Sequence, residues 1–131
     1  MSNAENYLLD SNTVIDYMEG KMPVRALEEM DKIIDQKAKI SVITQMEILG
    51  WFGATSVQLN LLNEFVADAI VFDLTSEMIN RTIKIRQQYK IKLPDAIIAA
   101  TALVYDLNLL SLNIRDFKNI DGLKIINSHE L

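Results

Sequence analysis

The alternation of short apolar runs with longer helical patterns constrains the fold of this chain more than any other feature. The apolar runs predict strands at residues 6–10, 38–43, 69–74, 108–112 and 123–127. The stretches between them carry apolar residues at the spacing of one helix face. Strands that alternate with helices form a parallel sheet with helices on both sides. We therefore expect an α/β fold, a three-layer α/β/α sandwich around a mainly parallel, five-stranded sheet.

Start signals locate the helices. Ser11 is expected to cap the first helix and Thr44 the third, because a hydroxyl can accept hydrogen bonds from the free N–H groups of a helix start. Thr75 or Ser76 is expected to cap the fifth helix. Pro94 suits the first turn of the sixth, where its missing N–H costs nothing. The second helix is expected from Pro23 to about Gln36 and the fourth over residues 55–67. The fifth and sixth are expected over 76–89 and 94–106, followed by a short turn or helix at 114–119.

The composition bounds the class of protein. With 131 residues, half of them hydrophobic, the chain is long enough for one domain with a real core. It has no cysteine, which excludes disulfides and thiolate chemistry, and we expect a cytoplasmic protein. No apolar run approaches the ~18 residues of a membrane span, and the start lacks a signal-peptide pattern. Because Ser2-Asn3-Ala4 matches a common expression-tag remnant, residues 1–5 are expected to be that remnant or a disordered start, and 6–131 the single domain.

Four acidic residues are placed where the predicted strands end or the following helices begin. Asp10 ends the first apolar run, and Asp116 follows the fourth. Glu47 and Asp95 lie in the predicted first turns of two helices. All four are therefore expected at the carboxyl edge of the sheet, where open α/β folds keep their sites. Crowded carboxylates repel one another, and a hard divalent cation such as Mg²⁺, or Mn²⁺ in its place, would compensate them.

Each acid also has a purely structural interpretation. Glu47, three residues after Thr44, fits a capping box, and Asp10 and Asp116 fit turns. Asp95 fits a favourable interaction with a helix dipole, which is expected to lower its pKa and keep it ionised. Singly these interpretations are the more common outcome, but four acids at one edge of a sheet call for a shared reason.

Four motifs that contain these acids resemble those of the PIN-domain nucleases, and especially the VapC toxins of bacterial toxin–antitoxin pairs. The motifs are residues 7–12 (Tyr-Leu-Leu-Asp-Ser-Asn), 41–48 (Ser-Val-Ile-Thr-Gln-Met-Glu-Ile), 93–102 (Leu-Pro-Asp-Ala-Ile-Ile-Ala-Ala-Thr-Ala) and 110–117 (Leu-Ser-Leu-Asn-Ile-Arg-Asp-Phe). The likeness covers essentially the whole chain, and the third motif is the most specific. The one departure is Ser111, where the family more often has threonine, and the hydroxyl is retained.

The resemblance implies a Mg²⁺-dependent endoribonuclease that forms a homodimer and is blocked by a cognate antitoxin. It implies that the metal-binding and catalytic residues are Asp10, Glu47, Asp95 and Asp116. Hydrogen-bonding support is expected from Ser11, Asn12, Ser111 and Asn113. The last motif leaves open whether Asn113 or Asp116 lies nearer the metal, and we favour Asp116.

The charge distribution reconciles an acidic protein with an RNA partner. The net charge of −5 alone argues against nucleic acid. Yet the segment from Arg81 to Lys92 holds five basic residues and no acid, and it leads directly to Asp95. We expect RNA contacts from Arg86, Lys90, Lys92 and Arg115. The alternative for the helical part is an ordinary solvated face.

Two further features concern partners. The apolar residues Leu49, Trp51, Phe52, Leu59 and Leu62 are expected to supply a dimer or antitoxin contact. For Trp51, base stacking is an alternative to packing. His129, the only histidine, is expected in solvent at a frayed end, so the general base would be a metal-bound hydroxide or a carboxylate.

Two other classes of function compete with a ribonuclease toxin. One is a non-catalytic PIN-like module that binds RNA or protein and serves regulation; retention of all four acids argues against it. The other is a phosphotransfer receiver or a phosphatase, which also places aspartate at strand ends. A receiver needs an acidic neighbour that Asp10 lacks, and the second aspartate of a phosphatase is replaced by Asn12.

Overall fold

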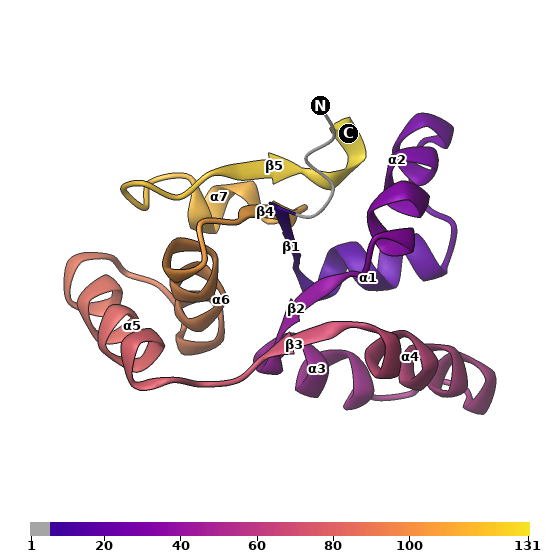
Figure 1. Ribbon diagram of the computed structural model, residues 1–131, viewed down its shortest axis with the longest axis horizontal. Coiled ribbons are helices and arrows are strands. Elements are labelled where there is room, and N and C mark those ends of the chain that lie inside the picture. Colours follow the sequence, from indigo (N-terminus) through magenta and orange to yellow (C-terminus); the bar gives the residue numbers. More distant parts are fainter. Residues whose placement is uncertain (1–5) are drawn as a thin grey trace.

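Parallel strands of three or four residues run through the middle of the molecule, as shown by the computed structural model, which describes residues 6–131 (Figure 1). They are β1 (Tyr7–Leu9), β2 (Lys39–Ser41), β3 (Ile70–Phe72), β4 (Asn108–Ser111) and β5 (Ile125–Asn127). The helices are α1 (Ser11–Met18), α2 (Val24–Asp35), α3 (Val42–Leu49), α4 (Ser56–Asp68), α5 (Ser76–Gln88), α6 (Leu93–Val104), α7 (Ile114–Phe117) and the 3-10 helix η2 (Ser128–Glu130). No helix within residues 6–131 is both long and apolar enough to cross a membrane. The expected tag remnant, residues 1–5, lies outside the described part of the chain.

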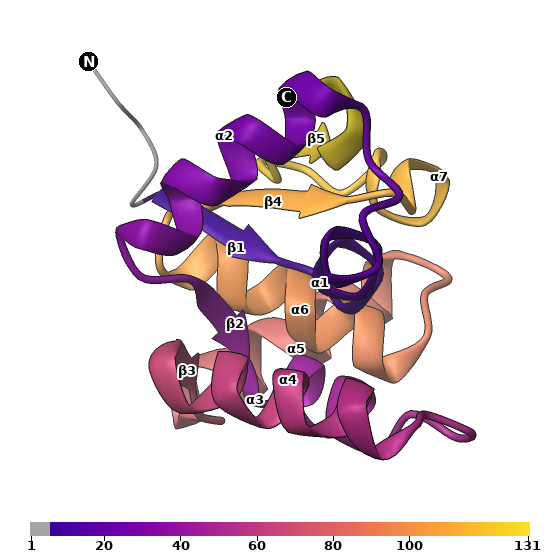
Figure 2. The ribbon, with the colours of Figure 1, turned by 90° about the vertical axis from the view of Figure 1, so that its right-hand side faces the viewer.

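The strands form two hydrogen-bonded ladders. One has the order β1-β4-β5 and the other pairs β2 with β3, and every pairing is parallel. β1 of the first ladder and β2 of the second lie side by side where the two ladders meet (Figure 2). The predicted α/β fold with five mainly parallel strands is therefore confirmed, although short strands divide the sheet into three strands and two.

Successive residues of the central strands pack on opposite faces of the sheet, because side chains alternate along a strand. Leu9 and Leu110 belong to a buried cluster with residues of α1, α2, α3 and α4. Leu8 and Leu109 belong to a second cluster with residues of α5, α6 and α7. Figure 1 shows these two groups of helices on either side of the strands. The three-layer arrangement expected from the sequence is confirmed.

The helix starts differ from the prediction at two places that matter for the site. The N-cap of α1 is Asp10 rather than Ser11. The N-cap of α3 is Ser41, whose Oγ accepts from the N–H of Ile43 at 3.1 Å, so the capping box predicted at Thr44 is wrong. Thr44 is instead buried within α3, and Glu47 is the sixth residue of that helix. Both hydroxyls are buried, and Ser41 is the cap because it lies at the end of β2, where the backbone is still extended as an N-cap requires.

Two other caps follow ordinary start signals. Thr75 caps α5, as expected, by accepting from the N–H of Met78. Thr55 and Gln58 form a capping box at the start of α4. The Thr-x-x-Gln pattern at this position is the sequence signal that reveals such a cap.

Candidate functional site

Asp10 stands at the point where β1 ends and α1 begins. Its side chain is only 5% exposed. Oδ1 accepts from the backbone N–H of Ser11 at 2.8 Å, and Oδ2 accepts from the hydroxyl of Ser111 at 2.7 Å. The parallel register that pairs Leu9 with Leu110 brings Asp10 and Ser111 together from opposite ends of the chain. The buried carboxylate is thus hydrogen-bonded on both oxygens, as burial of a charge requires.

Asn12 and Ser111 join the first and last motifs through further hydrogen bonds. The Oδ1 atom of Asn12 accepts from the N–H of Leu112 at 3.0 Å, and its Nδ2 lies 3.4 Å from Oδ2 of Asp10. Ser111 Oγ also accepts from the N–H of Asn113 at 2.9 Å. These contacts fix the end of β4 beside the start of α1. The structure therefore brings Asn12 and Ser111, two of the predicted supporting residues, into contact with Asp10.

The other two predicted supporting residues contact the other acids. The hydroxyl of Ser11 donates to Oε1 of Glu47 at 2.5 Å, which links α1 to α3. The amide of Asn113 donates to Oδ2 of Asp116 at 2.9 Å. An amide that donates to a carboxylate orients it, so Asn113 orients the side chain of Asp116. Glu47 and Asp116 are both exposed.

Asp95 is the third residue of α6 and is half-buried. Burial, together with the negative charges of Asp10, Asp116 and Glu47, raises the pKa of Asp95 to about 6, although Lys92 opposes the shift. The expectation that the helix dipole keeps this pKa low is therefore wrong, because desolvation and three neighbouring acids outweigh the helix start. The other three acids therefore all lie within electrostatic reach of Asp95.

Burial also raises the pKa of Asp10 above its ordinary value. The hydrogen bonds from Ser111 and Ser11 oppose this effect, and the charge of Glu47 adds to it. Both acids are therefore harder to ionise than free carboxyl groups, and a nearby cation would reverse that penalty.

The chemistry of the donors fits a hard divalent cation. Within residues 6–131, no three His, Cys, Asp or Glu side chains are grouped as a ready metal-binding set. Mg²⁺, however, keeps several of its waters and needs only one or two protein carboxylates. Burial and, to a lesser degree, neighbouring negative charge raise the pKa values of Asp10 and Asp95, and a bound cation would oppose both effects. The residues present therefore suit Mg²⁺ or Mn²⁺ bound partly through water.

A basic depression adjoins the acids. Arg86, Lys90 and Lys92 line a hollow of about 380 Å³ together with Ile91 and Asp116. Three of the predicted RNA contacts thus lie beside one of the acids. Arg115, the fourth, is exposed on α7 next to Asp116 in sequence. The hollow thus places three basic side chains beside Asp116.

The predicted apolar contact surface is only partly exposed. Phe52 is 98% exposed, whereas Leu62 is buried in the core, which makes the prediction wrong for Leu62. Leu49 and Trp51 pack against the same core cluster and stay half-buried, as does Leu59. For Trp51, packing rather than an open base-stacking position is what the structure shows.

His129 and Thr13 take part in contacts that the sequence did not reveal. His129 is half-buried and pairs through Nε2 with Asp16, so the prediction of a free histidine in solvent is wrong. Thr13 is fully buried and hydrogen-bonds the carbonyl of Leu110 at 3.0 Å. No local pattern marks the His129–Asp16 pair, since its members lie at opposite ends of the chain.

Comparisons with known proteins match this geometry to a family. A sequence model of the PIN domain matches residues 7–123, which include all four motifs. The curated protein Ribonuclease VapC1 from Rickettsia felis is 44% identical over 41 residues, a stretch that spans 31% of this chain and 31% of that protein.

Solved structures agree over nearly the whole chain. A chain of a toxin–antitoxin complex from Klebsiella pneumoniae is 29% identical, with a TM-score of 0.73 over 95% of this chain and 99% of that one. A chain of DNA-bound VapBC from Salmonella typhimurium is 25% identical, with a TM-score of 0.79 over 94% and 98%. Sequence, fold and the grouping of the four motifs therefore agree that the chain belongs to the PIN domain family.

Proposed function

We propose that this PIN domain is a metal-dependent endoribonuclease and the toxin of a toxin–antitoxin pair. One observation carries the proposal: burial and the charges of Asp10, Asp116 and Glu47 together raise the pKa of Asp95 to about 6, and Asp116 also lines a basic hollow. Negative charge concentrated next to positive charge suits a cation and a phosphate bound side by side. The name of the Rickettsia felis relative, a ribonuclease, supports RNA as the substrate.

In this proposal Asp10, Glu47, Asp95 and Asp116 hold Mg²⁺, with Mn²⁺ as a substitute. When bound, such a cation lowers the pKa of a coordinated water and neutralises charge on a phosphate. The protein's own contribution is orientation. Ser111 and the N–H of Ser11 hold the two oxygens of Asp10, Asn113 holds Asp116, and Ser11 Oγ holds Glu47.

Arg86, Lys90, Lys92 and Arg115 bind the phosphates of the RNA in this proposal. Their placement next to Asp116 would position the backbone of the RNA for attack at one phosphodiester. A carboxylate is the candidate general base among the protein's own groups, because the chain has no cysteine and its single histidine is paired with Asp16. No side chain needs to form a covalent intermediate.

The partners are also part of the proposal. The similar structures from Klebsiella pneumoniae and Salmonella typhimurium are described as toxin–antitoxin and VapBC complexes, which supports a cognate antitoxin. The exposed side chain of Phe52 supports a contact surface for that antitoxin or for a second copy in a homodimer. The cytoplasmic location expected from the cysteine-free composition belongs to the same proposal.

Incubation of the pure protein with total RNA tests the proposal. We expect new RNA ends with Mg²⁺ present and none after chelation. Asp95→Asn should abolish cleavage and leave RNA affinity equal or higher, because one repulsive charge is removed. Asp73→Asn is the matched control, since Asp73 is an exposed acid that also follows a strand but is not among the charges that act on Asp95. RNA binding without cleavage under all metal conditions would favour the non-catalytic module instead.

A further inference from the structure

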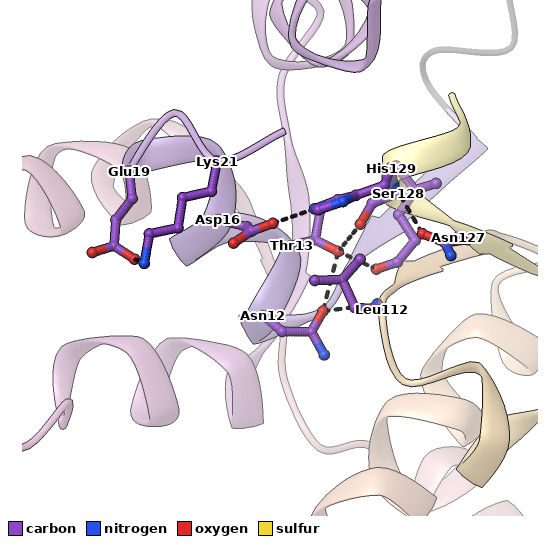
Figure 3. Close-up of polar contacts among 10 residues, drawn as sticks. Asn12, Thr13, Asp16, Glu19, Lys21, Leu112, Asn127, Ser128 and His129 are labelled. Atoms are coloured by element: carbon purple, nitrogen blue, oxygen red, sulfur yellow. Dashed lines mark hydrogen bonds and ion pairs between the residues drawn. The ribbon is translucent and has the colours of Figure 1, made fainter. Parts of the chain in front are cut away.

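The segment Asn127–His129, here named the C-terminal clamp, lies against α1 (Figure 3). Ser128 is fully buried, and its hydroxyl is 3.1 Å from the hydroxyl of Thr13. His129 pairs through Nε2 with Asp16. Asn127 shapes the turn by accepting from the N–H of His129 at 2.9 Å. The two contact points on α1 are three residues apart and therefore share one face of the helix.

Donor and acceptor chemistry gives the buried hydrogen bonds a direction. The carbonyl of Leu110 can only accept, so the hydroxyl of Thr13 donates to it at 3.0 Å. Thr13 has one proton, and Oδ1 of Asn12 lies farther away, at 3.3 Å, than this carbonyl; when Leu110 receives the proton, Ser128 donates to Thr13. The same carbonyl accepts from the backbone N–H of Asp10 at 3.0 Å. A chain of hydrogen bonds thus runs from the C-terminal clamp through Thr13 to the strand end beside Asp10.

We propose that the C-terminal clamp is a positioning element of the proposed active site. Ser128 and His129 hold α1 against the end of β4, so that Asp10 and Asn12 keep their contacts with Ser111 and Leu112. The inference rests on the proposed function for its catalytic part, and on the geometry alone for its structural part. The hydrogen bonds of the clamp reach α1 and, through Thr13, β4, and none is made to the four acids, so its residues act through these two elements.

The placement of these contacts distinguishes positioning from general support. The clamp holds α1 at Thr13 and Asp16, and Asn12 holds its first turn by accepting from the N–H of Leu112 through Oδ1. Thr13 bonds the carbonyl of Leu110, on β4. Its neighbour Asn12 bonds the N–H of Leu112, just after that strand. Loss of the clamp frees one side of this arrangement and lets the first turn of α1 shift relative to Ser111.

Hydrogen–deuterium exchange in the metal-free protein tests the structural part without any activity. The amides of Ser11, Leu112 and Asn113 bond Asp10, Asn12 and Ser111, so their exchange reports the site geometry. We expect His129→Ala to speed exchange in peptides that cover 10–14 and 110–114, and to leave α5 and α6 unchanged. Lys21→Ala is the matched control, because it removes the exposed Lys21–Glu19 pair just beyond the far end of α1.

Kinetics with RNA and Mg²⁺ test the catalytic part. We expect His129→Ala and Thr13→Val each to lower kcat about tenfold, which is the smallest effect usual for loss of a residue that orients a metal ligand. KM should stay unchanged, because the basic hollow is intact. Thr13→Ser keeps the hydroxyl and should restore kcat. Asp16→Ala combined with His129→Ala should be no worse than either change alone, since the two side chains act as a pair.

The outcomes separate this inference from the proposed function. Absence of cleavage by the unmodified protein would refute the ribonuclease proposal, and the exchange experiment would still decide whether the clamp orders the site. Normal kcat and unchanged exchange in folded His129→Ala would overturn the clamp. Should Thr13→Val fail to fold, His129→Ala still decides, because that side chain is partly exposed and its loss leaves no buried cavity.

Discussion

The two halves of the site are built differently. Asp10 and Ser111 form a closed half, in which a buried carboxylate has hydrogen bonds on both oxygens. Asp95, Asp116 and Glu47 form an open half that reaches solvent, and the carboxylate of Asp95 is perturbed by burial and charge rather than held by hydrogen bonds. The closed half belongs to the fold as much as to the site. In the open half, the negative charges of neighbouring acids act on Asp95, and a bound cation would relieve this repulsion. Perturbed pKa values of this kind are common at binding and catalytic sites.

The largest effect should come from the closed half. Asp10→Asn keeps a helix-capping side chain but removes one charge, so we expect the fold to survive and RNA cleavage to fall about a thousandfold, or about 4 kcal/mol of transition-state stabilisation. We also expect Mn²⁺ to raise the melting temperature of the unmodified protein and Asp10→Asn to remove most of that rise. Single-turnover cleavage and thermal melts check both effects. Cleavage at the unmodified rate would remove Asp10 from the site.

The second effect concerns stability alone. Ser111→Ala leaves the N–H of Asn113 without its partner and Oδ2 of Asp10 with only the 3.4 Å contact from Asn12, so we expect about 2 kcal/mol of destabilisation. Urea unfolding in the absence of metal measures it. Ser111→Thr keeps the hydroxyl and is the matched control. A destabilisation well below about 1 kcal/mol for the alanine variant would mean that the closed half is not part of the stable core.

A smaller effect is expected where the open half meets substrate. Lys90→Ala combined with Lys92→Ala should weaken RNA binding about tenfold and lower the slope of log affinity against log salt by roughly one unit for each phosphate that is no longer neutralised. The Mn²⁺-induced melting shift should remain, because neither lysine binds metal. Affinity across a salt series measures the slope. If the same variant failed to cleave saturating RNA while keeping its affinity, the assignment of these lysines to binding would be incorrect.

The smallest effect is a gain in stability. The pKa of Asp95 is raised to about 6 from an ordinary value of 3.8, so the folded protein holds this proton more tightly than the unfolded chain. Stability from this group is therefore present below about pH 4 and lost as the pH rises through about 6. After a discount for solvent screening, Asp95→Asn should stabilise the metal-free protein by about 1 kcal/mol at about pH 7.5.

Urea unfolding at several pH values tests this gain. The gain should shrink between about pH 6 and about pH 4, where the carboxyl of Asp95 becomes protonated, and Asp73→Asn should show no such dependence. A gain that stays constant across this range would show that Asp95 does not carry the charge repulsion of the open half.

The closed half is also the more predictable from sequence. A run of apolar residues that ends in Asp-Ser-Asn has few alternatives to a buried strand followed by a capped helix, and parallel pairing then brings Ser111 alongside. The open half depends on distances across the molecule that no local pattern encodes. Local sequence thus predicts that the helix dipole sets the pKa of Asp95. In the structure, burial and the charges of three acids from other elements set it instead.

Local ambiguity explains the remaining differences. Ser41 and Thr44 are both acceptable caps and both are buried; the extended backbone of Ser41, at the end of β2, selects Ser41. Glu47 consequently moves from a first turn to a second, yet still meets Ser11. The contact of His129 could not be predicted, because its partner, Asp16, is more than a hundred residues away.

The pairing of β1 with β4 has a consequence for the protein's synthesis on the ribosome. Strand partners for residues 7–9 are residues 108–110, so a nascent chain carries Asp10 long before it carries Ser111. Contacts of such high sequence separation form late and only after most of the chain is available. A growing polypeptide therefore has no closed half until Ser111 has been made. For a protein proposed to cut RNA, this order of assembly delays any activity until the last of the four motifs has been synthesised.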